Sequence, residues 1–259
     1  MSDARVPASR PVLRGQWTFD EGAGENAADS SGNGHDLTAN GRAVWTARGK
    51  FGGAVSLDAS RSWSTAGPVL RTDEDFSVVA WVRLAAVSMT AGVALPPGEF
   101  ALTAVSQSGP SHSAFYLGTR LIPTPQPDGS MQNTLRWNFT AAPVDGSMTG
   151  AIEWQHAAAT TPIDESMLDE WVLLVGVYDL TGRVAHIYVP GTGDDGSMPL
   201  PDNWTYWSAE DGVQIGFGRY LDGLADPWPG SVGPVRAFQG VLTAQDAADL
   251  YANDALSNA

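Results

Sequence analysis

The chain has 259 residues, 43% of them hydrophobic, and no shift in composition divides it, so we expect one domain with a sizeable core. Its formal net charge of −15 would repel nucleic-acid phosphates and anionic membrane surfaces, and the lack of cysteine excludes disulfides, thiolate metal sites and cysteine nucleophiles. No apolar run reaches the roughly 18 residues that a membrane helix needs, so we expect neither nucleic-acid binding nor membrane insertion.

Residues 1–12 are expected to form an extended arm. They contain Pro7 and Pro11 but no apolar pattern, and such a terminus frays unless a partner holds it. We therefore expect the arm to contact other structural protein subunits, in a homo-oligomer or in a larger assembly. The arm also lacks the apolar stretch of a secretory signal, which predicts synthesis in the cytoplasm without a signal peptide.

Residues 13–37 combine a strand with a long loop. Leu13, Gly15, Trp17 and Phe19 alternate with polar residues, and this period of two predicts a half-buried β-strand. The residues that follow are rich in Gly, Asp and Asn, which favour turns. Two interpretations of this loop remain open: a structural connection between strands, or an oxygen-lined Ca²⁺ site.

Short predicted strands follow along most of the chain, with turn residues between them. Residues 76–84 are apolar on both faces, as in a central strand that is covered on both sides. Residues 171–189 form the clearest hairpin, with its turn at 179–182. Further strands are predicted at 42–46, 53–58, 62–70, 101–107, 114–119, 134–140, 152–155, 213–218 and 232–238.

Only residues 243–251 have helical character. Thr243 can cap a helix, Asp246 stands at the matching position of a capping box, and the apolar residues that follow share one side. The regular recurrence of strands elsewhere predicts an all-β protein. We expect a two-sheet antiparallel sandwich over residues 13–251, with one short C-terminal helix and a tail at 252–259.

Five stretches occur in an order that is typical of one protein family. Together they resemble the laminin-G-like, concanavalin A-like jelly-roll domains of bacterial surface proteins and of phage tail or virion proteins. The stretches are WTFDEGAGENAADSSGNGHDLT (17–38), GKFGGAVSLD (49–58), FSVVAWVRL (76–84), WVLLVGVYDLTGRVAHIYVPG (171–191) and GSVGPVRAFQGVLTAQDAADLY (230–251).

This resemblance spans nearly all of residues 13–251 and implies a jelly roll. It implies two antiparallel sheets of six or seven strands, one of them concave, and often a structural Ca²⁺ near the first loop. It implies no single function, because this fold serves lectins, adhesins and glycosidases.

Asp20 and Asp29, at the first strand and its loop, are the candidate ligands for that Ca²⁺. The family's last strand usually carries an acid that helps to hold the ion. Here Gly233 stands at that position, which removes one ligand and one negative charge. The resemblance favours a bound Ca²⁺, whereas the loss of this acid disfavours one.

The sequence offers no catalytic constellation, and we expect a protein without enzymatic activity. Glycosidases on this fold carry Glu-x-Asp-x-Glu on one strand, and no such pattern is present. The nearest acids, at 164–170, precede a predicted strand. The four histidines show no metal-binding spacing, and no nucleophile elbow of a serine hydrolase occurs.

Four tryptophans in loop-like, polar or proline-rich contexts are the candidate ligand-binding residues: Trp154, Trp204, Trp207 and Trp228. Aromatic rings stack on sugar faces and anchor protein interfaces. The alternative is that these rings close the ends of the sandwich.

We therefore expect a non-catalytic binding or decoration module. The first hypothesis is a structural protein of a phage-like virion, a capsid decoration or minor tail protein, whose lectin-like domain contacts polysaccharide on the host cell surface. The second is a free carbohydrate-binding or adhesive domain of a bacterial surface protein, and the third is a glycoside hydrolase. The first two place the protein on a virion or at the extracellular surface.

Overall fold

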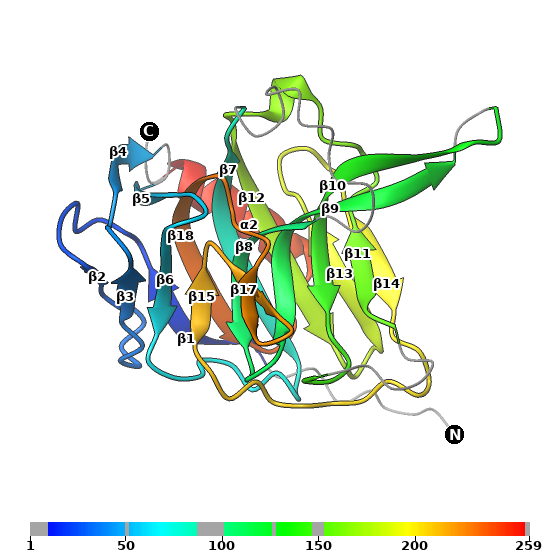
Figure 1. Ribbon diagram of the computed structural model, residues 1–259, viewed down its shortest axis with the longest axis horizontal. Coiled ribbons are helices and arrows are strands. Elements are labelled where there is room, and N and C mark those ends of the chain that lie inside the picture. Colours follow the sequence, from blue (N-terminus) through cyan, green and yellow to red (C-terminus); the bar gives the residue numbers. More distant parts are fainter. Residues whose placement is uncertain (1–9, 50–51, 87–100, 126–127, 147–152, 257–259) are drawn as a thin grey trace.

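The computed structural model describes residues 10–49, 52–86, 101–125, 128–146 and 153–256, and Figure 1 shows their arrangement. Residues 1–9 of the expected arm and residues 257–259 of the expected tail lie outside the described residues. Two antiparallel sheets pack face to face around one main core, which confirms the predicted all-β sandwich. No helix in the described part of the chain is long and apolar enough to cross a bilayer.

Within the described residues, both large sheets have eight strands, where the resemblance implies six or seven. The first sheet has the order β14 (Gly196–Pro199), β13 (Val184–Tyr188), β12 (Trp171–Asp179), β7 (Phe76–Leu84), β18 (Gly230–Gln239), β5 (Gly52–Leu57) and β4 (Trp45–Gly49), and β1 (Val12–Trp17) also pairs with β18. The second sheet has the order β11 (Gln155–Ala158), β10 (Met131–Ala141), β9 (Ser113–Pro125), β8 (Ala101–Ser108), β15 (Val213–Ile215), β6 (Ser62–Thr65), β3 (Leu37–Asn40) and β2 (Asn26–Ala27).

Three small elements complete the described fold. Strands β16 (Gly218–Tyr220) and β17 (Gly223–Ala225) form a separate hairpin, which lies in front of the second sheet in Figure 1. A 3₁₀ turn, η1, spans Glu165–Met167, and helix α2 (Ala244–Leu256) is the last element of the described residues.

The central strand β7 is covered on both faces, as predicted. Val78 and Ala80 point into the main core between the sheets, whereas Val79 and Trp81 belong to a smaller apolar cluster on the opposite face. Ala247 of α2 is buried in that smaller cluster, and Figure 1 shows α2 behind the first sheet. The second cover of the central strand is therefore the C-terminal helix.

Helix α2 begins with the predicted capping box. The backbone N and Oγ1 of Thr243 donate to Asp246 Oδ2 at 2.8 and 2.6 Å, and Asp246 N donates back to Thr243 Oγ1 at 3.2 Å. The helix continues to Leu256, beyond the expected end at Tyr251, and Asp254 in its last turn is bonded to side chains of the first sheet. The first part of the expected tail is therefore helical.

Strands β9 and β10 are longer than predicted and form a ribbon that projects from the sandwich in Figure 1. They pair along their whole length, out to Pro125 opposite Met131, where the sequence predicts strands only at 114–119 and 134–140. Prolines and polar residues in the outer ribbon interrupt the alternation, so the period of two ends where the ribbon leaves the core.

Several other predicted boundaries shift. The strand expected at 213–218 is two strands, β15 and β16, because Gly216 has a φ of 98° and turns the chain between them. The strand expected at 62–70 ends at Thr65, and the strand expected at 42–46 begins later, at Trp45. Residue 152 of the strand expected at 152–155 lies outside the described residues, and β11 begins at Gln155.

Candidate functional site

Two of the four candidate tryptophans are core residues. Trp228 is 0% exposed and lies in the main core, with its ring centroid 6.4 Å from that of Trp137. Trp204 is 4% exposed, and its indole Nε1 donates to the hydroxyl of Tyr178. Neither ring presents a face to a ligand, so their assignment to a binding site is corrected: these two residues close the sandwich.

Trp207 is partly buried and fastens its loop to neighbouring segments. Its Nε1 donates to the carbonyl O of Ala142 at 3.0 Å, and its own carbonyl O accepts from Thr72 Oγ1 at 2.9 Å. Its ring covers Gly109 so closely that a Cβ there would lie 2.7 Å from Cζ3 of the indole. The contacts of Trp207 are those of an anchor within the fold.

Trp154 belongs to a group of four rings that we call the aromatic cluster: His112, Tyr116, Trp154 and Tyr220. Trp154 is partly buried and stacks on Tyr116, with ring centroids 5.2 Å apart and an angle of 27° between the planes. His112 and Tyr220 meet Trp154 edge-on at 5.5 and 5.8 Å, and they meet each other at 5.2 Å. Tyr220 is 51% exposed, so the cluster opens to solvent at this ring.

The aromatic cluster lies on the outer face of the second sheet. Tyr116 stands on β9 between Phe115 and Leu117, which are buried in the main core, so Tyr116 points away from that core. Tyr220 comes from β16, and His112 comes from the turn between β8 and β9. The cluster therefore draws on segments that are far apart in the sequence.

His112 is fixed by the loop that follows β10. Asp145 Oδ1 accepts from the backbone N of Ser111 and of His112, at 2.9 and 2.7 Å. Gly146 N donates to His112 Nδ1 at 2.9 Å, so this ring nitrogen carries no proton. Burial lowers the pKa of His112, against the opposing negative charges of Asp145 and Asp222, which favours the same neutral form.

Tyr116 is fixed through both its hydroxyl and its ring. The hydroxyl accepts from Ser113 N at 3.1 Å and donates to the carbonyl O of Arg219. Gly218 lies against the ring, since a Cβ there would be 2.5 Å from Tyr116 Cδ1. Burial raises the pKa of Tyr116, so the phenol stays neutral. The surface beneath Trp154 is thus neutral, aromatic and held in one position.

Asp226 is a partly buried carboxyl at the end of the β16–β17 hairpin. Its backbone O accepts from Thr103 N at 2.8 Å, which ties the hairpin to β8. Burial raises the pKa of Asp226 to about 6, while the positive charge of Arg120 acts in the opposite direction. Its φ of 54° lies in the left-handed region, which Asp and Asn tolerate better than other side chains.

We expect Asp226→Asn to stabilise the protein by roughly 1–2 kcal/mol above about pH 7. The folded pKa is raised from 3.8 to about 6, so ionisation of Asp226 opposes folding as the pH rises through that range. The gain should be much smaller near pH 4, and it should vanish below about pH 3, where the carboxyl is neutral in both states. Urea unfolding of both proteins at about pH 4 and about pH 7.5 measures this, and an equal gain at both values would contradict it.

Sequence reasoning found Trp154 and missed the other three rings. Tyr116 occupies an outward position of an alternating strand, which is a usable signal for a ring on the outer face of the sheet, although this ring is itself buried beneath its neighbours. Tyr220 follows a predicted strand, and His112 stands between two serines; neither context marks a contact with Trp154. Their proximity depends on the packing of the β16–β17 hairpin over the second sheet.

The two metal-ligand candidates bind backbone groups. Asp20 Oδ1 accepts from Gly53 N at 2.8 Å. Both oxygens of Asp29 accept from backbone N–H groups at 2.9–3.0 Å, those of Gln16, Ser31 and His35. Among the residues that the structure describes, no group of three or more Asp, Glu, His or Cys side chains could hold an ion. Both carboxylates thus have a structural role in the first loop, and their role as Ca²⁺ ligands stays a prediction.

Comparison with known families and structures gives a consistent picture of the fold. Residues 57–248 match the family model described as the concanavalin A-like lectin/glucanases superfamily. One similar structure is domain 4 of AbnA, a GH43 extracellular arabinanase from Geobacillus stearothermophilus, solved in complex with arabinotriose. It is 17% identical to this chain with a TM-score of 0.59, and the match covers 93% of this chain and 99% of that domain.

Botulinum neurotoxins provide further similar structures. The receptor-binding domain of type G is 13% identical, with a TM-score of 0.55 and coverage of 93% of this chain and 51% of that chain. A structure of botulinum neurotoxin type C, whose cell entry depends on interaction with two ganglioside molecules, is 12% identical, with a TM-score of 0.59 and coverage of 94% of this chain and 51% of that chain. The present chain thus spans about half of these toxin chains. No curated protein matches the chain significantly.

Proposed function

Because the chain belongs to the concanavalin A-like lectin/glucanase superfamily, we propose that it is a carbohydrate-binding module without catalytic activity. The observation that carries this proposal is the aromatic cluster, in which Trp154 stacks on the fixed ring of Tyr116 beside the exposed ring of Tyr220. Flat aromatic faces contact the C–H faces of sugar rings, and rings that are fixed before binding lose little entropy on binding.

Two further observations support this proposal. The similar arabinanase domain was solved with arabinotriose, so a sandwich of this kind holds a short saccharide in that protein. The sequence also lacks the Glu-x-Asp-x-Glu pattern with which glycosidases on this fold place an acid and a nucleophile on one strand. Both observations favour saccharide binding over hydrolysis as the role of this module.

We further propose that the module works on the surface of a phage-like virion, or alternatively at the surface of a bacterium, where it meets polysaccharide. Residues 1–11 would attach it to other subunits, since they have no apolar pattern with which to fold alone, whereas Val12, the last residue of the expected arm, begins β1. The net charge of −15 keeps such a module away from nucleic acid during assembly. Electron microscopy of immunolabelled particles tests this placement.

Trp154→Ala should weaken glycan binding at least about tenfold, because a stacked aromatic contact contributes about 1.5 kcal/mol or more. A glycan array, followed by calorimetric titration with the strongest hit and with arabinotriose, measures the effect. Trp154→Phe keeps a flat ring of smaller area and should retain part of the affinity.

Tyr206→Ala is the matched control, since Tyr206 is a 51% exposed aromatic residue outside the cluster. It should bind as the unmodified protein does. Silence of the whole array, or equal affinity for Trp154→Ala and the unmodified protein, would overturn the assignment of the cluster.

A further inference from the structure

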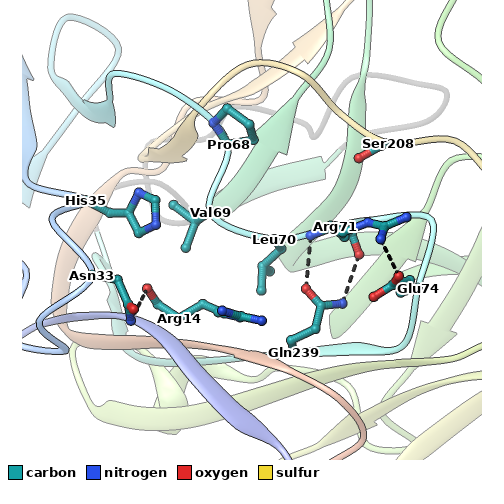
Figure 2. Close-up of a pocket in the computed structure, with 10 residues that line it drawn as sticks. All are labelled: Arg14, Asn33, His35, Pro68, Val69, Leu70, Arg71, Glu74, Ser208 and Gln239. Carbon is teal, nitrogen blue, oxygen red and sulfur yellow. Dashed lines mark hydrogen bonds and ion pairs between the residues drawn. The ribbon is translucent and has the colours of Figure 1, made fainter.

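A pocket of about 320 Å³ lies apart from the aromatic cluster and shares no residue with it. Figure 2 shows it between β1, the first loop, the segment before β7 and the end of β18. Its floor is apolar, with Val69 and Leu70 at 8% and 2% exposure. Its rim carries Arg14, His35 and Arg71. The volume suits a small ligand such as a monosaccharide unit.

Hydrogen bonds fix the floor and one wall of the pocket before any ligand arrives. Gln107 Oε1 accepts from Val69 N and Leu70 N at 3.2 and 3.0 Å. Gln239 Oε1 accepts from Arg71 N, and Gln239 Nε2 donates to Arg71 O, both at 3.0 Å, as Figure 2 shows. A ligand would therefore meet a preformed surface, which reduces the entropy cost of binding.

The first loop builds the opposite wall. Asn33 Nδ2 donates to the carbonyl O of Leu13 and of Arg14, at 3.2 and 3.1 Å, so the loop is tied to β1. His35 N donates to Asp29 Oδ2 at 3.0 Å, which sets the position of the imidazole at the rim. The glycine-rich loop therefore has a second role beyond connecting strands: it encloses a pocket.

Basic side chains outnumber acidic ones among the residues that line this pocket, although the protein as a whole is acidic. The chain has 29 acidic and 14 basic residues, yet this pocket carries two arginines and a histidine against one carboxylate, Glu74. Arg71 pairs with Glu74 at 2.6 Å and with Asp73 at 3.0 Å. In the part of the chain that the structure describes, no ion pair joins Arg14 to a carboxylate.

Arg14 is therefore a guanidinium available for an anion from outside the chain. A planar guanidinium donates two parallel hydrogen bonds to a carboxylate, which is the arrangement that selects a carboxylate over a neutral group. The hydroxyl of Ser208 and the ring of His35 add polar groups for hydroxyls, and Val69 and Leu70 offer an apolar surface for a C–H face. The pocket is therefore complementary to an acidic sugar, which has a carboxylate, hydroxyls and a C–H face.

We propose that this pocket binds the carboxylate of a uronic acid residue in a saccharide, with Arg14 as the group that pairs with the anion. This inference rests on the proposed function, because it names the sugar class, but it uses a different surface from the aromatic cluster. The two assignments therefore fail separately: Arg14 variants report on the pocket, and Trp154 variants report on the cluster.

Calorimetric titration with trigalacturonate and with its methyl ester tests the proposal. The two probes differ in charge and have the same sugar rings. We expect binding of the acid, with an affinity that falls as salt is added, and binding of the ester at least about tenfold weaker. Equal binding of acid and ester, or no binding of the acid, would overturn the pocket's assignment.

Arg14→Gln should lower the affinity for trigalacturonate at least about tenfold. Trp154→Ala should leave the ratio between the affinities for the acid and for its methyl ester unchanged. Arg42→Gln is the matched control, since Arg42 is another exposed arginine and does not line the pocket. Thermal melting checks that the variants fold alike. A short peptide with a free C-terminal carboxylate serves as a competitor. If this peptide binds more tightly than trigalacturonate, and its binding depends on Arg14, the proposed sugar ligand is wrong and the pocket binds a peptide.

Discussion

Replacing Asp254 by alanine should lower the free energy of unfolding by about 3 kcal/mol, because it leaves a partly buried arginine, whose side chain is 16% exposed, without its carboxylate. Asp254 is 8% exposed, and Arg236 donates to both of its oxygens, at 2.9 Å to Oδ2 and 2.6 Å to Oδ1. Trp81 Nε1 donates to Oδ2 as well, at 2.8 Å. A carboxylate in the last turn of a helix opposes the helix dipole, so the favourable part of its energy comes from these sheet contacts.

Urea unfolding followed by tryptophan fluorescence measures this loss, and amide hydrogen exchange in α2 shows whether the helix detaches before the sandwich unfolds. Asp254→Asn is the matched control: it keeps the volume and an acceptor for Trp81 but removes the charge, and we expect about half the loss. A loss below about 1 kcal/mol for Asp254→Ala, with unchanged exchange in α2, would show that apolar contacts alone hold the helix.

The features that the sequence predicted well are those that short stretches determine. Because β7 has apolar residues on both faces, the sequence predicts that both faces are buried. In the structure the main core buries one face, and α2 packs on the other. The Thr243–Asp246 capping box needs only neighbouring residues, and it forms as expected. The order of strand motifs along the chain was enough to indicate the concanavalin A-like sandwich.

The features that it predicted badly depend on contacts between distant segments. Trp204 and Trp228 stand in polar and proline-rich stretches, yet the burial of each ring is set by partners elsewhere, Tyr178 and Trp137. The outer β9–β10 ribbon is held by cross-strand pairing, which no local period reveals. The aromatic cluster joins a turn, a strand, a loop and a hairpin, so only Trp154 could be found from its own context.

The first loop shows the same division between local and distant causes. Its Gly, Asp and Asn content predicted turns correctly but left its role open. In the structure, three N–H donors converge on Asp29, one from β1 and two from the loop, which gives this carboxylate a structural role. Trp17 Nε1 then donates to His35 O at 2.7 Å, which ties a core indole to the same loop. The carboxylate of Asp29 thus occupies the centre of the loop.

Asp29→Ala should therefore destabilise the protein by about 2–3 kcal/mol, because three backbone N–H groups lose their acceptor and not all of them are open to water. Burial alone would raise the pKa of Asp29, but hydrogen bonds from Ser31 and from the backbone of His35 and Gln16 together lower it below 3.8. A lowered pKa means that this stabilisation is present above about pH 4 and is lost as the pH falls through the folded value.

Guanidinium unfolding at neutral pH compares Asp29→Ala with Asp20→Ala, whose exposed carboxylate accepts one backbone bond and should cost only about 0.5–1.5 kcal/mol. Because the N–H donors already occupy the oxygens of Asp29, we expect neither added Ca²⁺ nor a chelator to change the melting temperature. A calcium-dependent rise in melting temperature that both substitutions abolish would return the loop to the ion-site interpretation. Equal losses of unfolding free energy for the two variants would show that the three donors on Asp29 stabilise the protein no more than a single backbone bond does. The loop would then be held by its turns alone.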